Sequence, residues 1–139
     1  MLIGEYDYAV DEKGRLNFPA RFREEMGETF TVARWLDGSL VAFPQEKWET
    51  MAQRLLEKGF TKARDAQLYL FASAASAQPD KQGRILLPPK LRDYAKLEKE
   101  VTILGVGDHA EIWNTEAWRK RSASMTAEGF ASALEELEL

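Results

Sequence analysis

The sequence predicts an α+β protein built from two tandem copies of a β-rich module with flanking helices. The main observation is a repeated motif, because residues 11–23 and 80–92 share Asp-x-x-Gly-Arg, an apolar residue, any residue, an apolar residue and Pro. A basic residue, an apolar residue and Arg then end each copy. Alternating apolar and polar residues around the motifs indicate half-exposed strands. A repeat of this kind indicates duplicated structural units, so we expect one module per copy.

Length and composition are consistent with two small modules that depend on each other. Half of the 139 residues is near the size at which a lone core is marginally stable, so the halves should pack together or against other subunits. The 45% apolar and 11% aromatic content favours a folded chain, and the absence of cysteine excludes disulfides. No segment approaches the length of a membrane span or signal sequence, so we expect a cytoplasmic protein with no membrane partner.

The first module is predicted over residues 1–60. Its tight turn runs from Asp11 to Gly14, because an Asp side chain accepts hydrogen bonds from backbone amides and Gly supplies a positive φ. Pro19 suits the first turn of a short helix, and Asp37-Gly38 is a hairpin signal. The expected strands are 6–10, 15–18, 30–35 and 40–43, and the expected helices are 20–26 and 44–59.

A connecting helix over 61–72 is expected to lead to the second module at 73–121. Residues 73–79 are rich in Ala and Ser, which are poor strand formers, so their strand is inferred from the repeat alone. Residues 122–139 are predicted to form an acidic amphipathic helix or tail without a basic residue. The other expected elements are a turn at 80–83, strands 84–87, 101–104 and 111–113, and helices 89–95 and 115–121 capped by Asn114.

The charge distribution excludes a wholly basic nucleic-acid binder but allows a local basic surface. The chain has a net charge of −4. Residues 11–23 nevertheless carry four basic and two acidic side chains, and residues 80–92 carry four and one. The repeated motifs are therefore positive segments of an acidic protein.

The residues required for common catalytic and metal sites are mostly missing. With one histidine, His109, and no cysteine, the chain cannot form a His/Cys metal cluster or a cysteine nucleophile. We therefore expect no catalytic residues, no metal and no cofactor. His109 lies in a predicted hairpin turn at 105–109, where surface exposure is expected. Asp11 and Asp80 begin turns, where a structural role is more common than a catalytic one.

Arg15 and Arg84 follow the turn glycines and should stand at the rim of a strand–turn–strand unit. A guanidinium in this position can contact a phosphate or, with two hydrogen bonds, the edge of a guanine. It can equally form an ion pair with Asp11 or Asp80, four residues earlier, and so close the turn. The spacing slightly favours the ion pair. Both roles are compatible if the Asp orients the Arg.

The doubled motif resembles the paired Asp-x-x-x-Arg motifs of the MraZ family of bacterial transcriptional regulators. The order of the parts, the Phe43-Pro44 and Trp48 region and the length also match. The second turn departs from the family pattern, because Lys81-Gln82 stands where smaller residues are expected. The resemblance implies two SpoVT–AbrB-like modules that form a small β-barrel-like core, and a ring of about eight or more subunits.

The resemblance also implies a function. Such a protein would bind repeated sites in double-stranded DNA at the promoter of the division and cell-wall gene cluster, in the cytoplasm and at the nucleoid, without catalysing a reaction. The alternative is a structural or partner-binding oligomer with incidental DNA contact. By resemblance the DNA contacts are Arg15 and Arg84; charge adds Lys13, Lys81, Arg21, Arg23, Lys90 and Arg92 as helpers, while Asp11, Gly14, Asp80 and Gly83 would structure the loops. Arg21 to Arg23 could instead stabilise the short helix.

Overall fold

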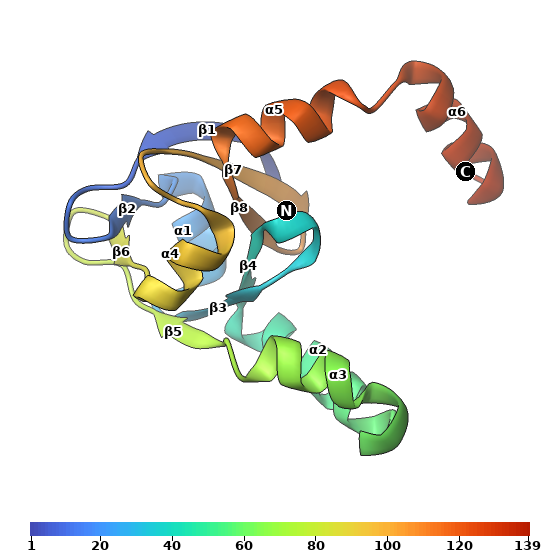
Figure 1. Ribbon diagram of the computed structural model, residues 1–139, viewed down its shortest axis with the longest axis horizontal. Coiled ribbons are helices and arrows are strands. Elements are labelled where there is room, and N and C mark those ends of the chain that lie inside the picture. The colour runs from blue at the N-terminus through green and yellow to red at the C-terminus, as the bar shows by residue number, and fades with distance from the viewer.

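The computed structural model describes residues 1–139 and has a mixed α+β fold (Figure 1). The first repeat contains β1 (Leu2–Ala9), β2 (Arg15–Asn17), α1 (Ala20–Met26), β3 (Phe30–Arg34), the 3-10 turn η1 (Leu36–Gly38), β4 (Leu40–Pro44) and α2 (Gln45–Glu57), followed by α3 (Phe60–Phe71). The second repeat contains β5 (Ala75–Ala77), β6 (Arg84–Leu86), α4 (Pro89–Ala95), β7 (Glu100–Gly107), β8 (Ala110–Asn114), α5 (Thr115–Ala123) and α6 (Ala127–Glu136). The predicted α+β class with a duplicated β-rich module is confirmed.

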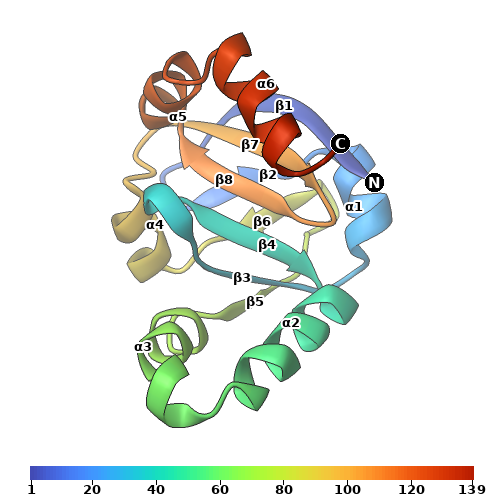
Figure 2. The same cartoon turned by 90° about the vertical axis from the view of Figure 1, so that its right-hand side faces the viewer.

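Both repeats contribute strands to the same two sheets. The larger sheet has the order β1-β7-β8-β4-β3-β5, and all its pairs are antiparallel (Figure 2). β1 of the first repeat thus lies on β7 of the second, and β5 of the second lies on β3 of the first. This sheet is open at β1 and β5, so the predicted barrel-like core is barrel-like only in a loose sense. The division of the chain into 1–60, 61–72, 73–121 and 122–139 stays a prediction from the sequence.

The two motifs meet in a separate ribbon of two strands, β2 and β6. Leu16 lies opposite Ile85 in this antiparallel pair. Arg15 lies opposite Leu86 on one side of them, and Asn17 lies opposite Arg84 on the other. Because corresponding motif positions exchange places in this register, an approximate two-fold axis passes between Leu16 and Ile85.

The core joins the repeats beneath the ribbon. Its main cluster of 19 buried residues draws on both copies of the motif, including Leu16 and Phe22 from the first and Ile85 and Leu91 from the second. Removing these side chains from water is the main favourable term in folding. Since each half covers the apolar residues of the other, the main core belongs to both halves together.

Most elements agree with the sequence predictions, and two strands that are longer than predicted depend on contacts between distant residues. β1 begins at Leu2 rather than Tyr6, because it pairs with β7 along its whole length and Leu2 is buried. β7 likewise continues to Gly107, so the turn expected at 105–109 is shorter. The expected strand at 73–79 contains only the three residues of β5, in keeping with its Ala and Ser content.

The ribbon and the longer helices occupy different parts of the molecule. In Figure 1 the ribbon and its turns lie at the left, whereas the α2–α3 hairpin and α6 extend at the lower and upper right. α3 packs on α2 and β3, but α6 has no buried residue. None of the helices is both long and apolar enough to span a membrane.

Candidate nucleic-acid interface

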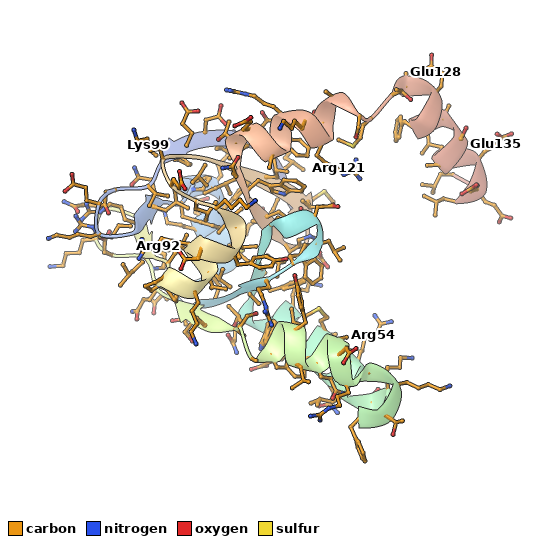
Figure 3. All side chains as sticks on the ribbon, in the orientation of Figure 1. Arg54, Arg92, Lys99, Arg121, Glu128 and Glu135 are labelled. Carbon is orange, nitrogen blue, oxygen red and sulfur yellow. The ribbon has the colours of Figure 1, made fainter.

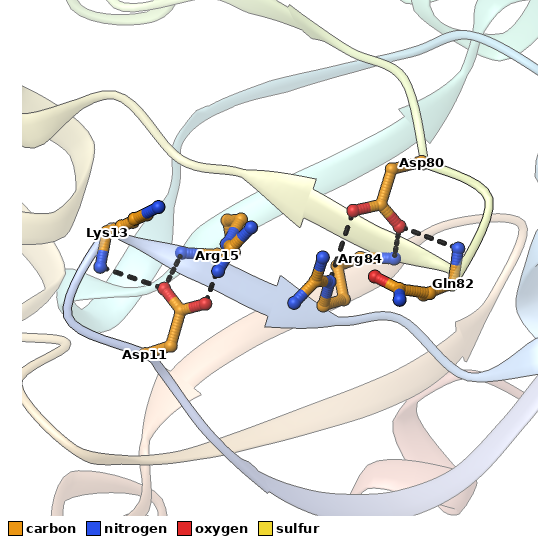
Figure 4. A network of polar contacts seen from close by, with 6 residues as sticks. All are labelled: Asp11, Lys13, Arg15, Asp80, Gln82 and Arg84. Atoms are coloured by element: carbon orange, nitrogen blue, oxygen red, sulfur yellow. Dashed lines mark hydrogen bonds and ion pairs between the residues drawn. The ribbon is translucent and has the colours of Figure 1, made fainter.

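The first motif turn is closed by the side chain of Asp11. Its Oδ1 accepts hydrogen bonds from the backbone amides of Lys13 (2.9 Å) and Arg15 (2.8 Å). Its Oδ2 accepts one from Nε of Arg15 at 2.7 Å (Figure 4). The backbone adds a bond from the Gly14 amide to the Asp11 carbonyl. Asp11 therefore fixes both the backbone of the turn and the direction of the Arg15 side chain.

The second turn repeats this arrangement. Oδ1 of Asp80 accepts from the amides of Gln82 and Arg84, both at 2.9 Å, and Oδ2 accepts from Nε of Arg84 at 3.1 Å. The predicted ion pairs Asp11–Arg15 and Asp80–Arg84 are thus both present. The larger Gln82 side chain does not disturb the turn, because only its backbone takes part in the network.

Hydrogen bonding favours the ionised form of both turn carboxylates. The backbone amide of Arg15 is the main cause that lowers the pKa of Asp11, and it outweighs the opposing effect of desolvation. The backbone amide of Arg84 lowers the pKa of Asp80 in the same way. Hydrogen bonds to the charged form of a carboxylate favour that form. The negative charges that orient the two arginines therefore persist at neutral pH.

Each turn glycine is covered by an arginine of the other repeat. Gly14 has a φ of 82°, and a Cβ built on it would lie 2.6 Å from Cζ of Arg92. The symmetry-related Gly83, with a φ of 80°, would place a Cβ 2.6 Å from Cζ of Arg23. The left-handed backbone therefore favours glycine, and an added Cβ would displace the guanidinium that lies over it.

The covering arginines are held by backbone carbonyls. Nε of Arg23 donates to the carbonyl of Phe18 at 3.1 Å, and Nε of Arg92 donates to that of Leu87 at 3.0 Å. The structure therefore gives Arg23 and Arg92 a positioning role at the turns, and their DNA contacts remain a prediction. A backbone hydrogen bond also joins the two repeats here, because the Phe18 amide donates to the Gly83 carbonyl.

The outer face of the ribbon carries four side chains. Arg15, Asn17, Arg84 and Leu86 alternate along the two strands with the fully buried Leu16 and Ile85. Leu86 is 61% exposed although it is apolar. Asn17 and Leu86 were not among the predicted site residues. Period-two spacing from the two motif arginines would have found them, because alternate residues of a strand share a face.

The motif arginines keep donors free for a ligand. The Arg15 and Arg84 side chains are 33% and 27% exposed, and each uses only Nε within the chain, so its Nη groups make no hydrogen bond with protein atoms. The turns add exposed Lys13 and Lys81, and α1 and α4 add exposed Arg21 and Lys90. None of these four forms an ion pair within the chain.

The prediction that His109 is surface exposed is wrong. Its side chain is only 14% exposed and packs against the ring of Phe43. Its ring nitrogens contact carboxylate oxygens of Asp108 at 2.8 Å and Glu111 at 3.3 Å. The β7–β8 turn folds onto aromatic residues of the first repeat, a contact that local sequence does not reveal. No group of three or more His, Cys, Asp or Glu side chains is placed to hold a metal ion.

The fold and this site define a class of internally duplicated α+β proteins whose two halves exchange strands and expose one arginine-bearing ribbon. Within it the chain belongs to the MraZ family, since the family model described as "MraZ protein, putative antitoxin-like" matches residues 1–69 and 70–139. The family expected from the doubled motif is thereby confirmed.

Individual relatives agree with this membership. The transcriptional regulator MraZ of Carboxydothermus hydrogenoformans is 50% identical over 121 residues, covering 85% of this chain and 84% of that protein. The protein of the same name from Heliobacterium modesticaldum is 47% identical, covering 86% and 85%. The one from Caldicellulosiruptor saccharolyticus is 44% identical and covers 99% of both chains.

Proposed function

We propose that this protein is a sequence-specific DNA-binding transcriptional regulator that reads repeated short sites with the outer face of its β2–β6 ribbon. The observation that carries the proposal is the placement of Arg15 and Arg84, diagonally related on one exposed face, each oriented by its own Asp and each with free Nη donors. The names of the relatives, transcriptional regulators, support the same function.

The two-stranded form and the side chains of the ribbon suit contact with base edges. A two-stranded ribbon fits into the major groove of B-form DNA, where an arginine can donate two hydrogen bonds to guanine. Asn17 can recognise adenine, and Leu86 can contact the methyl group of thymine. Because Asp11 and Asp80 already hold the guanidinium groups, little side-chain freedom is lost on binding. The approximate two-fold axis makes the two halves of the ribbon equivalent toward the DNA.

The exposed basic side chains beside the ribbon complete the interface. Lys13 and Lys81 in the turns, with Arg21 and Lys90, supply charges suited to phosphate contacts, which position a protein on DNA without reading its sequence. The net charge of −4 indicates that one subunit alone binds weakly. We therefore include in the proposal a ring of about eight or more subunits, several of which engage successive promoter repeats and so raise the avidity.

The expected target is the promoter of the division and cell-wall gene cluster. Fluorescence anisotropy with a labelled duplex from that promoter, against a scrambled duplex of equal length and composition, tests this directly. Tighter binding to the promoter duplex, by about a thousand-fold as for specific regulators, supports the proposal. Equal affinity for both duplexes would overturn it and favour an oligomer with incidental DNA contact.

A further inference from the structure

Helix α6 presents an apolar face that nothing in its own subunit covers. Phe130 is 65% exposed and Leu137 is 68% exposed, and with Leu134 they recur at the spacing of one helical face. The remaining surface is acidic, with four glutamates and no basic residue between positions 126 and 139. A ten-residue helix with this pattern has little stability in isolation, so packing against a partner is expected to hold it.

α6 extends away from the rest of its own subunit, and a short link joins it to α5. Ser124 ends α5, and its amide bonds to the carbonyls of Lys120 and Arg121. The side chain of Thr126 caps α6 by accepting from the Gly129 amide at 3.0 Å. Only Ser124 to Thr126 therefore separate the two helices. Figure 3 shows Glu128 and Glu135 of α6 far from Arg54 of α2 in the same subunit.

A groove with an apolar floor and a basic rim lies between α2, α3 and the β7–β8 turn. This cavity, which we name the α2–α3 groove, has a volume of about 720 Å³. Its apolar lining comes from the second hydrophobic cluster around Phe43 and Leu70, to which Trp35, Met51 and Leu55 are added.

The rim of the α2–α3 groove is basic. Lys47, Arg54 and Lys58 are exposed along α2 and its end, and none of them forms an ion pair within the chain. Asp108 is the only acidic residue of the lining. The groove thus has the charge opposite to that of α6, and complementary charges select both partner and orientation at an interface.

We propose that α6 of one subunit binds in the α2–α3 groove of a second copy of this chain. Phe130, Leu134 and Leu137 face the apolar floor, and the glutamates of α6 face the basic rim. Because the donor helix and the acceptor groove are different surfaces, the contact is heterologous and propagates from subunit to subunit until a ring closes. The inference rests on the self-association included in the proposed function and assigns a surface to it.

The absence of cysteine makes a disulfide test possible. A chain carrying both Leu134→Cys and Met51→Cys is oxidised and run on a non-reducing gel. The expected result is a ladder of covalent dimers, trimers and larger species that reducing agent removes. Mixing the two single variants should give covalent dimers only. The matched control pairs Leu134→Cys with Gln53→Cys, on the same helix but outside the groove lining, and should give no ladder.

Sedimentation of the wild-type chain separates the possible failures. An oligomer that forms without cross-linking at Met51 would place the interface elsewhere and overturn this inference, while leaving the proposed assembly intact. A disulfide within one chain would show that α6 folds back onto its own groove, which also overturns the inference. A wild-type monomer at micromolar concentration would overturn the assembly itself.

Point variants give an independent check of the same contact. Phe130→Ala should weaken self-association at least about ten-fold, as expected for an aromatic anchor. Lys47→Glu with Arg54→Glu should also weaken it, and Glu135→Lys with Glu136→Lys should restore association of that charge-reversed chain. Failure of this exchange to restore assembly, with all variants folded by circular dichroism, would contradict the charge pairing.

Discussion

Substitution of Gly14 by alanine tests the packing of one repeat on the turn of the other. Alanine at a φ of 82° adopts a left-handed backbone, which costs about 1–2 kcal/mol. Its Cβ would also lie 2.6 Å from Cζ of Arg92, so the guanidinium must move. That movement breaks the hydrogen bond from Arg92 to the Leu87 carbonyl, worth about 0.5–1.5 kcal/mol. The expected loss in the free energy of unfolding is about 1.5–3.5 kcal/mol.

Thermal unfolding followed by circular dichroism at a fixed protein concentration measures this loss. With an unfolding entropy of about 2.1 cal/mol/K per residue, the expected decrease in Tm is about 5–12 °C. The matched control is Gly38→Ala, where φ is 76° and nothing lies within 4 Å of the added Cβ. This control has only the backbone strain, so its Tm should fall by about 3–7 °C.

The arginine contribution can be isolated by a double-mutant cycle. Because Gly14→Ala already breaks the Arg92 hydrogen bond, adding Arg92→Ala should cost less than it does in the wild type, by about 0.5–1.5 kcal/mol. The same Arg92→Ala change should be additive with Gly38→Ala. Equal decreases in Tm for Gly14→Ala and Gly38→Ala would show that Arg92 does not stabilise this turn. Additive effects of Gly14→Ala and Arg92→Ala would show the same.

Three further predictions concern the turns, the histidine and the core. Asp11→Ala should weaken DNA binding because Arg15 loses its orientation, whereas the neighbouring Glu12→Ala should not; anisotropy titrations compare them, and equal effects would contradict the assigned role. Burial opposes protonation of His109, but hydrogen bonds and charges of Glu111 and Asp108 raise its pKa above 6.5. The stabilising contribution of protonated His109 is therefore complete below pH 6.5 and is lost as the pH rises through the raised pKa. Urea unfolding should show this pH dependence of the free energy of unfolding in the wild type but not in His109→Gln. The same pH dependence in both chains would contradict the assignment. Leu16→Ala, at a fully buried site on the axis, should cost about 2–5 kcal/mol in urea unfolding, and a loss below about 1 kcal/mol would contradict the shared core.

The turns and short helices could be predicted because their determinants are local. Asp11 and Gly14 specify their turn through bonds within four residues, and Pro19 specifies the start of α1. Spacing slightly favoured the ion pair between Asp11 and Arg15, and the structure contains it. The same spacing could not decide whether the arginine also contacts a ligand. An arginine that pairs with Asp11 through Nε still has its Nη groups free, so the two roles do not exclude each other.

The exchange of strands could not be predicted, because it depends on pairing between residues far apart in the sequence. Alternation around Tyr6 identifies a strand but not β7 as its neighbour. Charge suggested Arg92 only as a helper in DNA contact, and could not show that its guanidinium covers the glycine of the other repeat. His109 was misplaced for the same reason, since the aromatic residues that bury it belong to the first repeat.

The proposal that the ribbon arginines read DNA is tested most directly by the discrimination of an Arg15→Ala/Arg84→Ala chain between the promoter duplex and its scrambled counterpart. Each arginine–guanine contact contributes about 1–3 kcal/mol of discrimination, so the double variant should lose at least about thirty-fold in the ratio of the two affinities. The control chain Lys62→Ala/Arg119→Ala has the same charge change at exposed positions on α3 and α5 and should keep the wild-type ratio. An unchanged ratio in the folded ribbon variant would contradict the proposal.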